Sequence, residues 1–324
     1  MQRRIIAAGL GGLLALPALA REGLAQGDAA RWPAREISLV TGFGPGGGTD
    51  LVARALAGHM EKSLGVSVIV RNMPGAGGTL GPAFVARSRP DGYTFGLVAA
   101  SAILVAPLVM DTPYRPWESF DFLAGTSELR IGWPVGPSLP DVRTLEDLIA
   151  VGKRRRITFG TTNAGAAVSF FDLARMTGAD FAYVAFSSIT EAAAQVAGGH
   201  LDTYTGTPEM IPLVKGGQLR MVASASVDRW PEFPEVPTLR ERGFDTVTRQ
   251  LIGFAGPAGL PVVVRDKLAT ALLAAAHDRA VQERQASASV APRPMTREEY
   301  LAALREVQPG IERALQAAGV MRSR

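Results

Sequence analysis

Five of the seven residues from Gly42 to Gly48 are glycines, and they follow a β-like stretch over residues 36–41. Residues 42–47 fit G-x-G-x-x-G, a pattern typical of dinucleotide sites. A glycine-rich turn from a strand into a helix presents unpaired backbone N–H groups at the positive end of the helix dipole, and it binds phosphate, sulfate or carboxylate. The run therefore predicts an anion site without naming the anion.

A second glycine loop follows the next β-like stretch. Residues 74–77 read Pro-Gly-Ala-Gly, much like Pro-Gly-Gly-Gly at residues 45–48. Both loops are expected at the carboxyl ends of neighbouring parallel strands, where open α/β folds bind ligands. Two such loops at one sheet edge favour a shared anion site over two unrelated tight turns.

A nucleotide is the less favoured ligand. A dinucleotide site needs an acidic residue at the end of the second strand, and here that strand ends in Arg71-Asn72. Arg71 could accommodate the 2′-phosphate of NADP, so this position alone does not exclude a dinucleotide. Pro45 removes one N–H donor, and no Gly-Lys-Ser/Thr motif occurs. We therefore expect no nucleotide and no other cofactor.

Groups that could carry catalysis or bind a metal are sparse. The chain has no cysteine, and its three histidines, His59, His200 and His277, do not have the spacing of metal ligands. The patterns H-E-x-x-H and G-x-S-x-G are absent. The sequence thus predicts no metal site and argues against an enzyme.

The first residues have the form of an export signal. Arg3-Arg4 precede an apolar run over residues 5–20 that is too short to span a bilayer and ends in an A-x-A cleavage pattern. We expect residues 1–26 to be a signal peptide for the Sec or twin-arginine route, and the mature protein to be periplasmic. Exported compartments generally lack free nicotinamide cofactor. A net charge of +4 from scattered residues predicts no nucleic-acid or membrane surface.

Strand-like and helix-like stretches alternate along the remaining chain, which predicts an α/β fold with mostly parallel sheets. The expected strands cover residues 36–41, 66–70, 94–99, 130–135, 157–160, 181–186, 201–205, 220–224 and 250–256. The expected helices cover residues 49–64, 80–87, 145–153, 168–177 and 190–198, and two more start near Pro261 and at Thr296, the latter with a Thr-Arg-Glu-Glu capping box. Pro309 is expected to kink the last helix.

The tail of the chain needs a packing partner. Returning it to the first unit gives lobe 1 from residues 28–126 and 246–324, and lobe 2 from residues 127–245, with a cleft between them. Two serial domains are the alternative.

Several segments resemble landmarks of the Bug family, the periplasmic receptors of tripartite tricarboxylate transporters. They are residues 31–50, ending in Phe-Gly-Pro-Gly-Gly-Gly-Thr-Asp, together with 72–78, 90–94, 234–238 and 253–259. They occur in order over essentially the whole mature chain. The resemblance implies a two-lobed periplasmic-binding-protein fold of the Venus flytrap, type II-like kind. It also implies a small carboxylate held by loop amides and water, and a two-component membrane permease as partner. We expect a monomer.

The second lobe departs from the family pattern. Where the family usually has Gly-Ser-x-Gly-x-Gly-Thr-Ser-Ser-His, residues 160–169 read Gly-Thr-Thr-Asn-Ala-Gly-Ala-Ala-Val-Ser. A common Tyr-Lys-Gly begins here with Phe186, and an Asp-Asn-type pair is Gly206-Thr207. The lost donors predict a ligand with one carboxylate and an apolar or aromatic remainder, held distally by Phe186 and threonine hydroxyls, rather than citrate.

The candidate ligand-binding residues come from the two glycine loops and from strand ends of both lobes. They are Gly46, Gly47, Gly48, Thr49, Asp50, Gly75, Ala76, Gly77, Ser101, Thr161, Thr162, Gly165, Ala166, Phe186, Thr205 and Thr207. Asp50 is most simply explained as a first-turn residue that suits the helix dipole rather than as a ligand contact, and Arg249 either meets an acid group or faces solvent. The favoured function is a solute receptor for uptake. An orphan binding or sensor protein is the alternative, and an exported enzyme is the least favoured.

Overall fold

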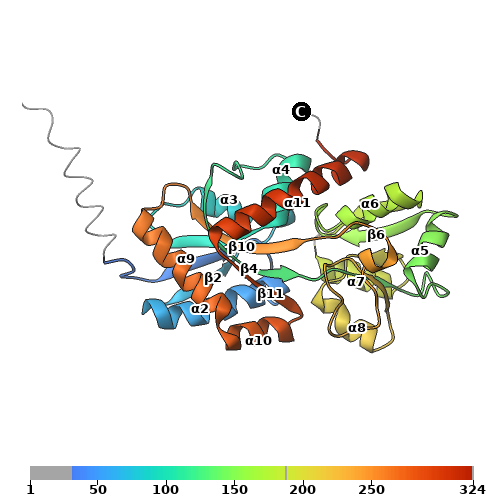
Figure 1. Cartoon of the computed structure of the whole chain (residues 1–324), viewed down its shortest axis with the longest axis horizontal. Coiled ribbons are helices and arrows are strands. Elements are labelled where there is room, and N and C mark those ends of the chain that lie inside the picture. Colours follow the sequence, from blue (N-terminus) through green and yellow to red (C-terminus); the bar gives the residue numbers. More distant parts are fainter. Residues whose placement is uncertain (1–30, 187, 323–324) are drawn as a thin grey trace, which may run out of the picture.

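The computed structural model describes residues 31–186 and 188–322, which form two α/β units joined by extended segments (Figure 1). The expected signal peptide, residues 1–26, lies outside the described residues. In the described part of the chain, no helix is both long and apolar enough to cross a membrane.

The first unit, called lobe 1 below, contains a six-stranded sheet in the order β11-β4-β10-β3-β1-β2. Its strands are β1 (Ile37–Thr41), β2 (Val68–Asn72), β3 (Thr94–Ala99), β4 (Phe120–Leu129), β10 (Gln250–Pro257) and β11 (Val290–Met295). Its helices are α2 (Gly48–Leu64), η1 (Ala76–Gly78), α3 (Leu80–Ala86), η2 (Ser101–Val105), α4 (Ala106–Val109), α9 (Val262–His277), α10 (Arg279–Ser287) and α11 (Arg297–Ala317).

Each face of this sheet has its own core. Leu39 belongs to the core under α2 and α9, whereas its neighbour Val40 belongs to the core under α3 and α11. This division follows from the alternation of side chains along a strand. Helices therefore cover both faces, and the carboxyl ends of β1, β2 and β3 are left to form a site.

The second unit, called lobe 2, contains a five-stranded sheet in the order β7-β6-β8-β5-β9. Its strands are β5 (Gly132–Val135), β6 (Ile157–Thr161), β7 (Phe181–Ala185), β8 (Thr203–Tyr204) and β9 (Arg220–Ser224). Its helices are α5 (Leu145–Gly152), α6 (Val168–Thr177), α7 (Ile189–Ala197), η3 (Pro208–Met210), α8 (Ile211–Lys215) and η4 (Arg240–Arg242). Stacked aromatic rings, with Phe170 between Trp133 and Phe159, fill its centre.

The predicted two-lobed α/β fold is confirmed, but each sheet is mixed rather than mostly parallel. β1 pairs in parallel with β2 and β3, whereas β10 is antiparallel to both β3 and β4, and β11 to β4. In lobe 2, β6 is parallel to β7 and β8, and β5 is antiparallel to β8 and β9. The antiparallel pairs arise at β4, β5 and β10, where the chain passes between the lobes.

The sequence analysis missed strands β4 and β11. β4 has buried residues at eight of its ten positions, including Thr126, Ser127 and Glu128. A strand covered on both faces lacks the alternation of apolar and polar residues by which a half-buried strand is recognised. β11 carries prolines at 292 and 294, which count against a strand in sequence reasoning.

Helix α11 spans the two lobes (Figure 1). Near its start, the Tyr300 hydroxyl donates a hydrogen bond of 2.7 Å to the Val98 carbonyl in lobe 1. Farther along, Ile311 and Leu315 pack in the core that contains Phe171 of α6 in lobe 2. The helix continues through Pro309, where a kink was expected, as one element. Besides the two crossing segments, α11 is thus a third connection between the lobes.

Candidate ligand-binding site

The second glycine loop has an unusual backbone. Gly75, Ala76, Gly77 and Gly78 all have positive φ, at 136°, 47°, 64° and 89°. For Ala76 this left-handed conformation costs roughly 1 kcal/mol or more, because an L side chain is disfavoured there. Strained backbone of this kind collects at ligand sites.

This loop leaves backbone donors unused. The Gly78 and Thr79 N–H groups donate to carbonyls within the turn, at Gly75 and Ala76. Within the described residues, the Ala76 and Gly77 N–H groups have no intramolecular acceptor. Successive free N–H groups in a tight turn form a concave anion-binding surface.

A cavity of about 350 Å³ opens beside these two residues, between the lobes. Its volume lies at the low end for small-molecule sites. Lobe 1 and lobe 2 both contribute to its wall, together with the C-terminal segment. The lining residues are Ala76, Gly77, Ser101, Val105, Ala106, Val109, Met110, Thr162, Asn163, Ala164, Tyr183 and Val320.

Ser101 is a buried polar side chain of this wall, and its hydroxyl has no partner among the described residues. The residue is 3% exposed, and its hydroxyl makes no hydrogen bond within the described part of the chain. A buried hydroxyl without a partner costs about 1–3 kcal/mol. The Ser101 hydroxyl is therefore available to a group that enters the cavity.

The facing loop of lobe 2 lies close to lobe 1. A Cβ placed on Gly77 would be 3.9 Å from the Thr162 carbonyl oxygen, and one on Gly165 would be 2.7 Å from Cγ2 of Val105. Asn163 uses its side chain within its own turn, where Oδ1 accepts from the Ala166 N–H. The lobes thus meet across the cleft in this conformation.

The first glycine loop is shaped by Asp50. Its Oδ2 accepts from the Gly46 N–H at 2.9 Å and from Nε of Arg54 at 2.9 Å, and its Oδ1 accepts from Nδ2 of Asn72 at 2.8 Å. Asn72 also donates to the Phe43 carbonyl at 3.0 Å. Asn72 ends β2 just before the second loop, so Asp50 and Asn72 tie the two loops together.

Burial alone would raise the pKa of Asp50. Hydrogen bonds from Arg54, the Gly46 N–H and Asn72 outweigh that effect and hold its pKa below the ordinary value. The carboxylate is therefore charged and occupied by groups of the protein itself. Of the loop amides, those of Gly47, Gly48 and Thr49 have no acceptor within the described residues.

The structure brings together only some of the predicted site residues. Ala76, Gly77, Ser101 and Thr162 line the 350 Å³ cavity, and Gly165 lines a neighbouring one. The remaining candidates lie outside the lining of both cavities; they are Gly46, Gly47, Gly48, Thr49, Asp50, Gly75, Thr161, Ala166, Phe186, Thr205 and Thr207.

Two of those candidates in lobe 2, Phe186 and Thr207, have other contacts, and a third, Thr205, is buried. The ring of Phe186 packs over Gly160 and against the core around Leu201. The Thr207 hydroxyl and N–H both donate to Glu209, whose pKa is raised by burial. Thr205 is buried with an unpartnered hydroxyl in the described residues.

Sequence reasoning missed the apolar part of the wall. Val109, Met110 and Val320 carry no chemical signal in the sequence, and Tyr183 was assigned only to a strand. No pattern in the neighbouring sequence indicates that Val320, near the end of the chain, reaches the cleft. Its place depends on the packing of α11, after which the Arg322 N–H donates to the Leu108 carbonyl at 2.9 Å.

The neighbouring cavity, of about 550 Å³, shares Ser101 and Val105 with the first and lies along the returning segment and α11. Its lining carries charges of both signs: Asp172, Arg240, Asp245, Arg249, Arg293, Glu306 and Arg313. Arg249, which the sequence left between a ligand contact and a surface residue, is already bound within the protein.

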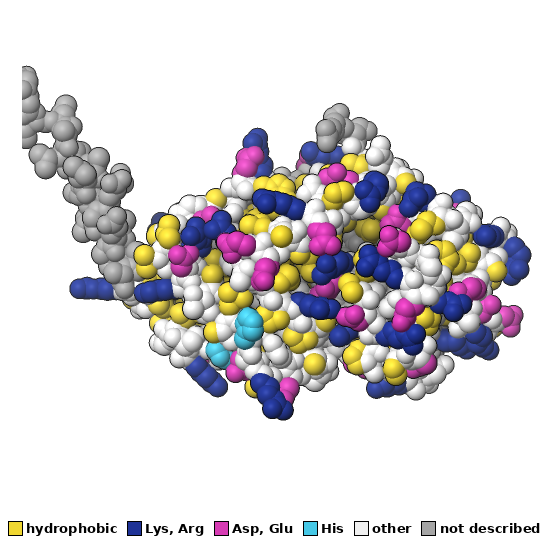
Figure 2. Space-filling model, in the orientation of Figure 1, with side chains coloured by type: hydrophobic (Ala, Val, Ile, Leu, Met, Phe, Trp, Pro, Cys, Tyr) yellow, Lys and Arg dark blue, Asp and Glu magenta, His cyan; other side chains and the backbone are white. Residues whose placement is uncertain are grey.

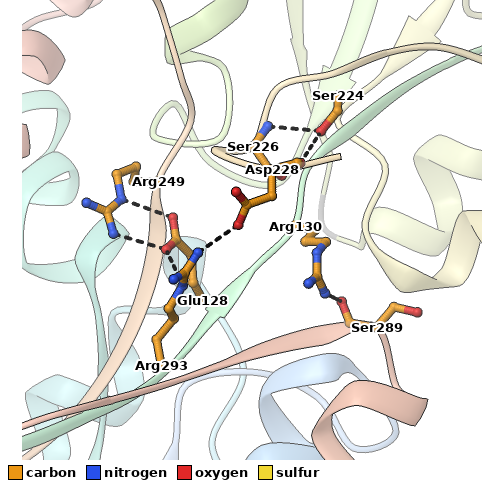
Figure 3. Close-up of polar contacts among 8 residues, drawn as sticks. All are labelled: Glu128, Arg130, Ser224, Ser226, Asp228, Arg249, Ser289 and Arg293. Carbon is orange, nitrogen blue, oxygen red and sulfur yellow. Dashed lines mark hydrogen bonds and ion pairs between the residues drawn. The ribbon is translucent and has the colours of Figure 1, made fainter. Parts of the chain in front are cut away.

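Charged side chains join the segments between the lobes (Figure 3). Arg249 donates from Nε and Nη2 to the two carboxylate oxygens of Glu128, both at 3.1 Å. Arg293 of lobe 1 lies 3.8 Å from Glu128 and donates to Asp228 of lobe 2 at 2.8 Å. The Ser289 hydroxyl of lobe 1 donates a hydrogen bond to the Glu232 carboxylate of lobe 2. We call the four residues Glu128, Asp228, Arg249 and Arg293 the hinge cluster.

A family model described as the tripartite tricarboxylate transporter family receptor matches residues 52–315. The chain belongs to this receptor family. The resemblance seen in the sequence is thereby confirmed, and the family is one of solute-binding receptors rather than enzymes.

Relatives of the receptor match most of its length. A protein of Cupriavidus necator, the UPF0065 protein in the gbd 5′ region, is 32% identical over 273 residues, which cover 83% of each chain. The structure of the periplasmic binding protein BugD is 27% identical, with a TM-score of 0.79 over 90% of this chain and 100% of BugD. MatC of Rhodopseudomonas palustris, with bound malate, is 26% identical, with a TM-score of 0.74 over 88% of this chain and 99% of MatC.

Proposed function

We propose that this receptor binds a small carboxylate between its lobes and delivers it to a two-component membrane permease. The observation that supports this most directly is one end of the 350 Å³ cavity, where the free Ala76 and Gly77 N–H groups and the Ser101 hydroxyl are found. These groups can donate to a carboxylate without a charged side chain. The malate bound by MatC supports the same class of ligand.

In this proposal the lobes, residues 28–126 with 246–324 and residues 127–245, close on the ligand by motion of the crossing segments. The sheets support a first crossing slightly later than residue 126, because β4 continues to Leu129 before β5 starts at Gly132. The first glycine loop, through Gly47, Gly48 and Thr49, would supply further amides. The protein acts as a monomer in the periplasm, exported by a signal in residues 1–26.

Thermal-shift and calorimetric screening of the mature protein with mono-, di- and tricarboxylates tests the proposal. A ligand at 100 times its Kd should stabilise the protein by roughly 2.7 kcal/mol. Binding of a nicotinamide nucleotide, with no response to any carboxylate, would rule the proposal out. If a carboxylate binds but no permease subunits are co-expressed or captured with the receptor, the alternative of an orphan binding or sensor protein is favoured.

Gly77→Val tests the loop. A side chain there strains a backbone with φ of +64° and grows toward the Thr162 carbonyl, so carboxylate affinity should fall at least tenfold. Gly217→Val is the matched control, because Gly217 has φ of +71° but no heavy atom within 4 Å of its Cβ position. The control should lose similar stability and keep its affinity. Equal affinities of the two variants would remove the second loop from the site.

A further inference from the structure

We propose that the ligand is a monocarboxylate with an extended apolar body, and that this body lies along η2 and α4 toward the C-terminal segment. The proposal rests on the proposed function, because the carboxylate is placed at Ala76, Gly77 and Ser101. It deepens that function by naming the part of the ligand that the cavity selects.

The cavity has a polar end and an apolar end. Its polar groups are the loop amides, Ser101, Thr162, Asn163 and the Tyr183 hydroxyl, and all but Tyr183 of β7 come from the two facing loops and the start of η2. Its apolar groups continue along the same helical stretch to its end, through Val105, Ala106, Val109 and Met110. A helix rises about 1.5 Å per residue, so Ser101 and Met110 are separated by on the order of 10 Å, the length of a short alkyl chain.

Among the described residues, the apolar end contains no cationic partner for a second carboxylate. The cavity lining as a whole includes no Lys, Arg, His, Asp or Glu among the described residues. Burial raises the pKa of Tyr183, so its hydroxyl is neutral. A second carboxylate at this end would be removed from water without a cation, which is strongly unfavourable.

The C-terminal segment completes the apolar end. Val320 lines the cavity, and the next turn of chain is fastened to α4, since the Arg322 N–H donates to the Leu108 carbonyl and its guanidinium pairs with Asp111. Met110, beside Asp111, and Val320 therefore approach the cavity from two segments far apart in the sequence. A wall held in this way would cover part of the ligand's apolar body.

The arginines of the neighbouring cavity do not favour a dicarboxylate over a monocarboxylate. Arg249 is held by Glu128 and Arg293 by Asp228. Asp172, Asp245 and Glu306 also line that cavity. A second carboxylate reaching it would meet Arg240, Arg249 and Arg293 already paired, beside three acidic groups, with Arg313 as the fourth arginine of that lining.

Calorimetry with hexanoate and adipate tests the inference, because the two six-carbon chains differ only in a terminal methyl or carboxylate group. We expect hexanoate to bind at least tenfold more tightly than adipate, and more tightly than propionate. Adipate binding as tightly as hexanoate would overturn the inference and leave the receptor function standing. If malate or citrate bound and hexanoate did not, the inference would likewise be overturned while the receptor function stood. Failure of every carboxylate to bind would count against the function itself.

A lysine at the apolar end provides the second test. Val109→Lys should weaken hexanoate binding and strengthen adipate binding, each at least tenfold, with a smaller change in propionate binding. Val263→Lys is the control, because Val263 lies on α9, is 51% exposed and is absent from the cavity wall. Val320→Lys provides the same test from the opposite wall if Val109→Lys does not fold. Equal changes for all three ligands, or none, would overturn the placement of the apolar body.

Discussion

At the scale of single residues, Asp50 shows how a candidate binding residue can act through its neighbours. Its two oxygens accept from the Gly46 N–H, Arg54 and Asn72, so the carboxylate is occupied by the protein. By using the Gly46 N–H it holds the first loop in place while the next amides remain free. Asp50 is therefore a positioning residue in the proposed site, and it is better tested through stability than through ligand contact.

Asp50→Asn should lower stability in a pH-dependent way. The folded-state pKa of Asp50 lies below its unfolded value, so its contribution is fully present above the unfolded pKa, near 3.9, and is lost as pH falls through the folded pKa. We expect the variant to be less stable by about 1–3 kcal/mol at pH 7, and the difference to shrink below pH 4. Urea unfolding at pH 7, 5 and 3 measures this. Asp141→Asn, at an exposed position, should show no such trend.

At the scale of elements, α11 combines a local start with a long-range course. Thr296 and Glu299 form the predicted capping box, in which the Thr296 hydroxyl accepts from the Glu299 N–H and the Glu299 carboxylate accepts from the Thr296 N–H. Farther along, the helix leaves lobe 1 and packs on α6 of lobe 2. The cap sets where the helix begins, and packing sets which lobes it connects.

Thr296→Ala should destabilise the protein by about 1 kcal/mol, because a helix N–H loses its side-chain acceptor. Thr296→Ser keeps the acceptor and should recover most of the loss. Thermal and urea unfolding of the two variants give the comparison. If alanine and serine were equivalent, the hydroxyl would contribute nothing and the assigned cap would be wrong.

At the scale of the whole molecule, the hinge cluster lies where the lobes are joined (Figure 3). Charged side chains of both signs are also scattered over the face in view across both lobes (Figure 2). The Arg293–Asp228 pair connects the lobes in a conformation in which their loops meet across the cleft. It thus favours the arrangement of the lobes described here, although its partners are 43% and 61% exposed and each such pair contributes only modestly.

Asp228→Asn should favour the open arrangement. We expect a larger radius of gyration without ligand by small-angle scattering, and a two- to fivefold weaker ligand affinity at low salt. The difference should fade at high salt, where such pairs are screened. Glu283→Gln, which removes a pair with Arg279 inside α10, is the control and should leave both quantities unchanged. An unchanged radius in Asp228→Asn would show that the pair does not influence closure.

The sequence by itself determined the features that depend on local backbone preference and spacing. The glycine loops, the capping box at Thr296 and the helix over Val168–Thr177 were predicted because the types and spacing of neighbouring residues determine turn geometry and helical periodicity. The order of motifs also indicated the family and its two lobes. Strand β4 was not predicted because a strand buried on both faces has no alternating pattern.

Only the tertiary structure decided which of these parts meet. The link from Asp50 to Asn72 joins residues 22 apart, and the cavity joins Ser101 to Thr162 and Val320. Such contacts depend on the packing of whole elements, and no short-range pattern of residue types specifies them. The sequence singled out Ala76, Gly77, Ser101 and Thr162, and packing brings these four to one cavity, whereas the ring of Phe186, expected at the distal end of the ligand, packs over Gly160. The apolar wall exists because α11 returns Val320 to α4, and that course is set by the packing of both lobes.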